Sequence, residues 1–147
     1  MGSEMCIRDR ADTVVRNYAD LLLGDLQALE ARAGELSLQA LVESLFGLLR
    51  GRPRERAAAV PLAEARMDER ARRTTFRHML RKNIAAIFRA RAPALSAEAA
   101  RDMAIVTVQL MKAASSLSDE DGLAGRGAAL RELQALTVQY LQQRLGA

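Results

Sequence analysis

Apolar residues recur every three or four positions through every long segment of this chain. That spacing places apolar side chains along one face of an α-helix. A β-strand would need apolar and polar residues in alternation, with hairpin turns between the runs. The chain has neither pattern, and its aromatic content is 3%. The sequence therefore predicts an all-α fold, a bundle of five to six helices.

Glycine, proline and short polar segments divide the helical pattern. Pro53 follows the second segment and Pro93 follows the fourth, because proline lacks the backbone donor that would continue a helix. Ser96 is the expected N-cap of the fifth helix. We expect helices over residues 13–33, 37–50, 54–66, 68–92, 96–117 and 127–145, the third being short or kinked at Pro61.

The first ten residues, MGSEMCIRDR, share no apolar period with the segment that follows. The string MCIRDR resembles translated sequencing-adapter sequence. We therefore interpret residues 1–10 as a non-native or disordered N-terminal remnant and expect the true start of the protein to be missing. Asp12 is then the expected N-cap of the first helix. Residues 11–147 form the single helical domain that a chain of this length predicts.

The residue types needed for catalysis or metal binding are scarce. His78 is the only histidine, and one imidazole does not make a zinc or di-iron site without matching ligands. We interpret it as a surface histidine. The sequence has no Gly-rich phosphate loop and no Gly-x-Ser-x-Gly nucleophile elbow. We expect no enzyme activity, no metal and no cofactor.

Cysteine content and hydropathy bear on location. Cys6 is the only cysteine, so no disulfide forms within a monomer, which fits a reducing compartment. No apolar run approaches the about 20 residues needed to cross a bilayer. We expect a cytoplasmic protein with no membrane partner.

Two arginine-rich stretches, residues 50–56 and 70–82, leave two interpretations open. Arginines in such stretches can neutralise DNA phosphates. Acidic neighbours such as Glu55 and Glu69 dilute the positive field, the net charge is only +4, and no aromatic residues are interleaved for stacking on single strands. A solvated helix face is the preferred interpretation.

The order of the segments and their end motifs have a counterpart in a known family. A Leu/Phe-rich segment closes with RGRP at residues 50–53, and the long arginine-rich segment ends FRARAP at residues 88–93. The last two segments carry LSAEAAR at 95–101, an apolar run at 103–111 and LREL at 130–133. Over about Thr13 to Leu145 this resembles the C-terminal, ligand-binding and dimerisation domain of TetR/AcrR-type transcriptional regulators.

The resemblance implies a regulator that binds DNA through an N-terminal helix-turn-helix. Nothing before Thr13 is long enough to form one, so we expect this chain to be a fragment that meets DNA only through a domain missing from it.

The resemblance also implies a homodimer in which the last two helices of each subunit pair with their symmetry mates. Small residues there permit close helix approach, and larger apolar ones give contact area. The residues expected at this interface are Ala100, Ala104, Met111, Leu133, Leu136, Thr137, Tyr140 and Leu141.

A third implication is an apolar cavity among the middle helices. The expected lining mixes methionine, aromatic and a few polar side chains, which suits a small hydrophobic effector. No buried charge is evident in the pattern, so we expect an apolar or weakly polar effector. The lining residues are Phe46, Leu49, Phe76, Met79, Leu80, Asn83, Met103 and Thr107. The alternative from the all-α pattern alone is a generic helical adaptor without a ligand.

Overall fold

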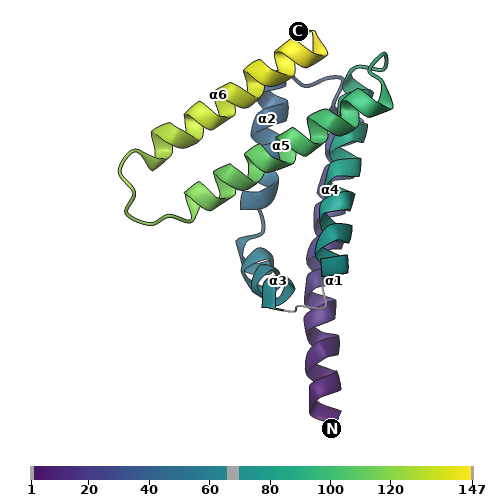
Figure 1. Cartoon of the computed structure of the whole chain (residues 1–147), viewed down its shortest axis with the longest axis vertical. Helices are drawn as coiled ribbons and strands as arrows, with labels where there is room; N and C mark the ends of the chain where they lie inside the picture. The colour runs from purple at the N-terminus through teal and green to yellow at the C-terminus, as the bar shows by residue number, and fades with distance from the viewer. Residues whose placement is uncertain (1, 66–69, 147) are drawn as a thin grey trace.

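The computed structural model describes residues 2–65 and 70–146, and its regular structure there is entirely helical (Figure 1). The predicted all-α fold is confirmed. The helices are α1 (Gly2–Arg32), α2 (Leu38–Arg50), α3 (Pro53–Ala65), α4 (Arg70–Arg91), α5 (Ala97–Ser118) and α6 (Arg126–Leu145).

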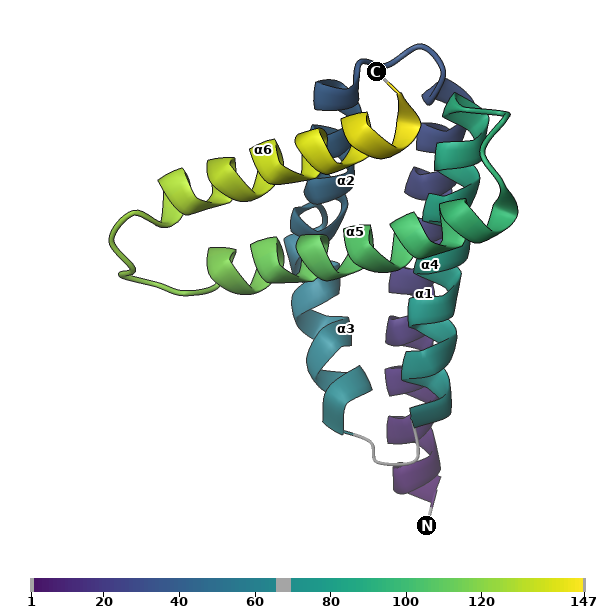
Figure 2. The same ribbon diagram turned by 45° about the horizontal axis from the view of Figure 1, so that its top comes forward.

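Two helix pairs organise the molecule. α1 and α4 lie side by side and run in the same direction (Figure 1). At their shared C-terminal end, the Arg91 guanidinium donates hydrogen bonds to the backbone carbonyls of Ala33, at 3.2 Å, and Leu36. α5 and α6 form an antiparallel pair joined by the loop between them (Figure 2), and α2 packs against both. α3 packs on α1.

The helix ends follow from local sequence. The Ser37 and Ser96 hydroxyls each accept a hydrogen bond from the backbone N–H three residues later, at 3.1 Å, so the prediction that Ser96 caps its helix is confirmed. Pro53 begins α3, where its missing N–H leaves no helical bond unmade. Pro61 lies inside α3, as the sequence predicted.

The N-terminal expectation differs from the structure. α1 begins at Gly2 rather than near Thr13, so residues 2–10 are helical, and Asp12 lies inside the helix instead of capping it. The interpretation of residues 1–10 as a non-native remnant stays a prediction. The Thr13 hydroxyl donates to the Asp9 carbonyl at 2.7 Å, one turn earlier. A polar segment without proline extends an existing helix readily, because adding a residue costs far less than nucleating a turn. The fourth helix begins at Arg70, and the expected start at residue 68 lies outside the described residues.

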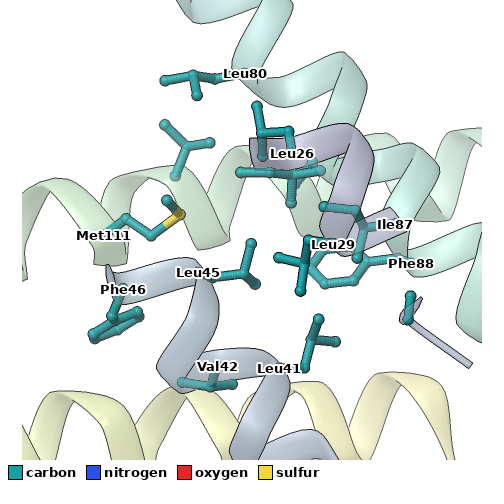
Figure 3. Packing of buried hydrophobic residues seen from close by; sticks show 14 of the residues in the cluster. Leu26, Leu29, Leu41, Val42, Leu45, Phe46, Leu80, Ile87, Phe88 and Met111 are labelled. Carbon is teal, nitrogen blue, oxygen red and sulfur yellow. The ribbon is translucent and has the colours of Figure 1, made fainter. Parts of the chain in front are cut away.

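The core is built from the helix faces that the periodicity identified (Figure 3). α1 contributes Leu26 and Leu29, which meet Leu41 and Leu45 of α2 and Phe88 of α4. Each buried leucine or phenylalanine side chain contributes about 1.5–3 kcal/mol relative to leaving it exposed. This shared interior fixes how the helices sit around the candidate sites described next.

The corner between α2 and α3 is tied to α1 by an ion pair. Arg52 donates two hydrogen bonds to the Asp25 carboxylate, from Nε at 3.2 Å and from a terminal nitrogen at 3.1 Å. Such bidentate geometry gives orientation as well as attraction. It positions α3 beside α1.

Candidate effector site and dimer surface

The eight residues predicted to line a ligand cavity fall into two groups. Phe46, Leu80, Met103 and Thr107 are buried, whereas Leu49, Phe76, Met79 and Asn83 are partly buried. Their polar groups bond within their own helices: the Thr107 hydroxyl donates to the Met103 carbonyl at 2.7 Å, and the Asn83 amide donates to the Met79 carbonyl at 2.8 Å. Half of this set is therefore buried, and the other half is partly exposed.

A hollow of about 400 Å³ lies elsewhere, where α2, α3 and the C-terminal end of α5 meet. Its size falls within the range typical of small-molecule pockets. The lining is mostly aliphatic with two arginines and two polar residues: Leu49, Arg50, Pro53, Arg56, Ala57, Val60, Pro61, Ser118 and Asp119. Of the predicted lining, Leu49 alone borders this hollow.

Arg56, which lines this hollow, also contacts α5 and the residue that follows it. Its guanidinium donates a hydrogen bond to the Ser115 hydroxyl on α5 and lies 3.8 Å from the Asp119 carboxylate. The sequence placed Arg56 in a solvated corner, but the structure makes it a link between α3 and α5. The periodicity of apolar residues around Ser115 did not predict its hydrogen bond with Arg56.

Tyr18, on α1, lies within reach of the charge of Arg56. Its side chain is 5% exposed, and its ring stacks on Phe76 with a centroid separation of 6.2 Å. Burial raises the pKa of the Tyr18 hydroxyl, and the positive charge of Arg56 opposes that rise. In the sequence, Tyr18 occupies a position on the apolar face of the helix expected over residues 13–33. Its hydroxyl group was the available signal, because a tyrosine hydroxyl on a buried face usually needs a hydrogen-bond partner.

The predicted interface residues separate by burial. Five are buried within the subunit, where they pack against the other helices: Ala100, Ala104, Met111, Thr137 and Leu141. A side chain enclosed in its own subunit offers no surface to a partner, so these five are core residues in this structure. Leu133 and Tyr140 are partly buried against the core, and Leu136 is 57% exposed.

The outer faces of α5 and α6 carry further apolar side chains. Ile105 and Val106 of α5 are exposed, as Leu136 of α6 is. Sequence analysis assigned neither Ile105 nor Val106 to the interface. Their signal was the apolar run of residues 103–111, which continues past the width that one buried face needs.

The scarce reactive side chains are not gathered into a centre. His78 and Cys6 are exposed. Within the part of the chain that the structure describes, no three side chains of the His, Cys, Asp and Glu types are placed to hold a metal ion. None of the described helices combines the length and hydropathy that a membrane span requires.

Comparison with known proteins agrees with this architecture. Residues 35–141 match the family model described as "Tetracyclin repressor-like, C-terminal domain", a regulatory and non-enzymatic family. Neither a search of curated proteins nor one of solved structures finds a match. The matched region covers all of α2 to α5 and most of α6, and it includes every residue that lines the hollow. The chain therefore belongs to the tetracycline-repressor-like C-terminal domain family.

Proposed function

We propose that this chain is the effector-sensing and dimerisation domain of a TetR-type transcriptional regulator. In such a protein a small ligand modulates DNA binding by a helix-turn-helix domain, which would lie outside residues 35–141. The observation that carries the proposal is the family match over those residues. Because such a regulator acts on DNA, we also expect the protein in the cytoplasm.

The hollow beside α3 is the proposed effector site. It joins aliphatic walls to a few polar groups, which is the usual composition of small-molecule sites. An occupant would contact α2, α3 and α5 together, so its binding would favour one arrangement of these helices over others. The effector is accordingly small and largely apolar.

The dimer surface is proposed on the outer side of α5 and α6. These helices pair along one side of the molecule (Figure 2) and expose Ile105, Val106 and Leu136. Exposed apolar side chains on adjacent helices are typical of association sites. A twofold dimer would bring this surface against its own copy, so each substitution would act twice in one interface.

The experiment measures association and ligand stabilisation on the same protein. Light scattering should show a dimer that Leu136→Glu weakens, because the carboxylate would be desolvated twice in the interface. Leu123→Glu is the matched control, since Leu123 is also exposed, at 45%, but lies in the loop before α6. A monomer unaffected by either change would favour the adaptor alternative.

Ligand binding is tested by thermal unfolding in the presence of a panel of small apolar compounds. A compound at a hundred times its dissociation constant should stabilise the fold by about 2.7 kcal/mol. Val60→Trp, which would fill part of the hollow, should abolish that stabilisation. Ala58→Trp is the control, because Ala58 is exposed on the same helix. A panel without any stabilising compound contradicts effector sensing.

A further inference from the structure

Two buried polar atoms lack a hydrogen-bond partner among the described residues: the Tyr18 hydroxyl oxygen and Arg81 Nε. An unsatisfied buried polar group destabilises the folded state, and a charged one does so more strongly. The two residues belong to α1 and α4, which pack together. Phe76, just over one helical turn before Arg81, stacks on the Tyr18 ring. An unmet donor on each of two packed helices indicates a place where an acceptor binds.

Positive charge is concentrated next to these donors. Arg77 and Arg81 lie one turn apart on α4, and Lys112, on the neighbouring α5, is partly buried and close enough for both charges to act on it. Burial lowers the pKa of Lys112, and the charges of Arg77 and Arg81 lower it further. Within the described residues, none of these three cations forms an ion pair with a carboxylate. Like charges held together repel one another, and among the described carboxylates none pairs with these three, so an anion would relieve the repulsion.

Arg56 closes this group of residues into a ring. It bonds to Ser115, which follows Lys112 by three positions and so neighbours it on α5. Its charge also reaches the Tyr18 hydroxyl. We call this set the cationic ring; its members are Tyr18, Arg56, Arg77, Arg81, Lys112 and Ser115. Four helices supply them: α1, α3, α4 and α5.

The cationic ring and the apolar hollow share a residue. Arg56 belongs to the ring and also lines the hollow. A molecule with an apolar body and a charged end would therefore satisfy both features at once. The sequence predicted an apolar or weakly polar effector, because no buried charged residue was evident in its pattern. The partial burial of Lys112 and the buried Nε of Arg81 remove that premise.

We propose that the cationic ring binds the anionic head group of the effector, while the effector's apolar body occupies the adjoining hollow. The inference rests on the proposed function, since it names the chemical class of the ligand sensed by this domain. A carboxylate and a phosphate share the required chemistry, namely negatively charged oxygens that accept hydrogen bonds from arginine, lysine and tyrosine.

The test compares three probes that differ only at one end: decanoate, its neutral methyl ester and decyl phosphate. Titration calorimetry is done below the concentration at which each probe forms micelles. Decanoate should bind about tenfold more tightly than the ester, which is the size expected for one charge-assisted hydrogen bond. Decyl phosphate shows which head the ring prefers, and tighter binding of either anion than of the ester supports the proposal.

Variants then show whether the preference comes from the ring. Lys112→Met and Arg81→Met should each bring decanoate and methyl decanoate to nearly equal affinity, because methionine keeps the aliphatic length and removes the charge. Lys82→Met is the matched control, since Lys82 is exposed on α4 next to Arg81, and it should keep the full preference. Thermal unfolding of each variant verifies that it is folded.

The outcomes separate the inference from the proposed function. Equal affinity for decanoate and its ester in the unmodified protein contradicts the inference, and so does a preference that survives both ring substitutions. Effector sensing would still stand in either case, because the ester binds. Failure of all three probes also contradicts the inference, whereas effector sensing is then judged by the broader compound panel and the Val60→Trp variant.

Discussion

The Arg56 guanidinium donates a hydrogen bond to the Ser115 hydroxyl and thereby joins α3 to α5. The same guanidinium lies 3.8 Å from the Asp119 carboxylate near the end of α5. α3 itself packs on α1. A single side chain thus connects the helix that walls the hollow to the helix that carries part of the proposed dimer surface. We propose that a ligand bound in the hollow would act on the proposed dimer surface through this connection.

Removing Arg56 should loosen α3. We expect Arg56→Met to lower the free energy of unfolding by about 1–2 kcal/mol, because it leaves Ser115 without its donor and removes the contact with Asp119. Urea denaturation followed by circular dichroism measures the change. Arg54→Met is the control, since Arg54 lies two residues earlier on the same helix and its side chain is exposed. Equal stability of the two variants would show that the Arg56–Ser115 contact is not held in solution.

Tyr18 should make the stability of the domain depend on alkaline pH. Its pKa in the folded chain is raised above the ordinary value of 10.0, so the folded state holds the proton more tightly than the unfolded state. The resulting stability is complete below pH 10 and is lost as the pH rises toward the folded pKa.

Tyr18→Phe removes this titration together with the unsatisfied hydroxyl. The ligand-free variant should be at least as stable as the unmodified protein at neutral pH and should lose less stability above pH 10. Urea denaturation at neutral and alkaline pH measures both effects, with Tyr140→Phe as the control for general alkaline unfolding. An identical alkaline loss in the unmodified protein and in Tyr18→Phe would contradict the assignment.

Phe88 tests the core that holds the site in place. Its ring extends from α4 and is fully buried beside Leu29 of α1 (Figure 3). Phe88→Ala should lower the free energy of unfolding by about 3–5 kcal/mol, from lost burial and from the cavity left behind. Leu123→Ala removes an apolar side chain that is 45% exposed and should cost far less. A loss below that of the control would place Phe88 outside the core.

Helix positions and the core were predictable because both depend on local periodicity. Leu26, Leu41 and Phe88 are buried where the three- and four-residue spacing puts them. The break at Pro93 and the cap at Ser96 are local signals of the same kind. The start of α1 was missed because polar residues 2–10 carry no apolar period, yet nothing in them stops a helix.

The candidate sites depend on which helices meet, and periodicity does not encode that. The predicted ligand lining took apolar residues from the inner faces of several helices, of which Phe46, Leu80 and Met103 are buried in this structure. The hollow lies instead against α3, a helix with almost no apolar stripe, and Arg56 and Lys112 looked like ordinary surface charges. Only tertiary packing brings Arg56 near Tyr18, and Lys112 near Arg77 and Arg81.

Ser96 caps the N-terminal end of α5, the helix that supplies residues to both the cationic ring and the proposed dimer surface. Its hydroxyl accepts from the Ala99 N–H at 3.1 Å and so satisfies one of the free donors at the start of the helix. Ser96→Ala should cost about 1 kcal/mol, measured as the free energy of unfolding in urea, whereas Ser116→Ala on the exposed side of α5 should cost little. Because α5 supplies Lys112 and Ser115 to the ring and Ile105 and Val106 to the outer face, fraying of its first turn should leave the Lys112 end intact. Ser96→Ala should therefore lower stability without changing the preference for decanoate over its ester, and a lost preference would mean that the ring depends on the whole length of α5.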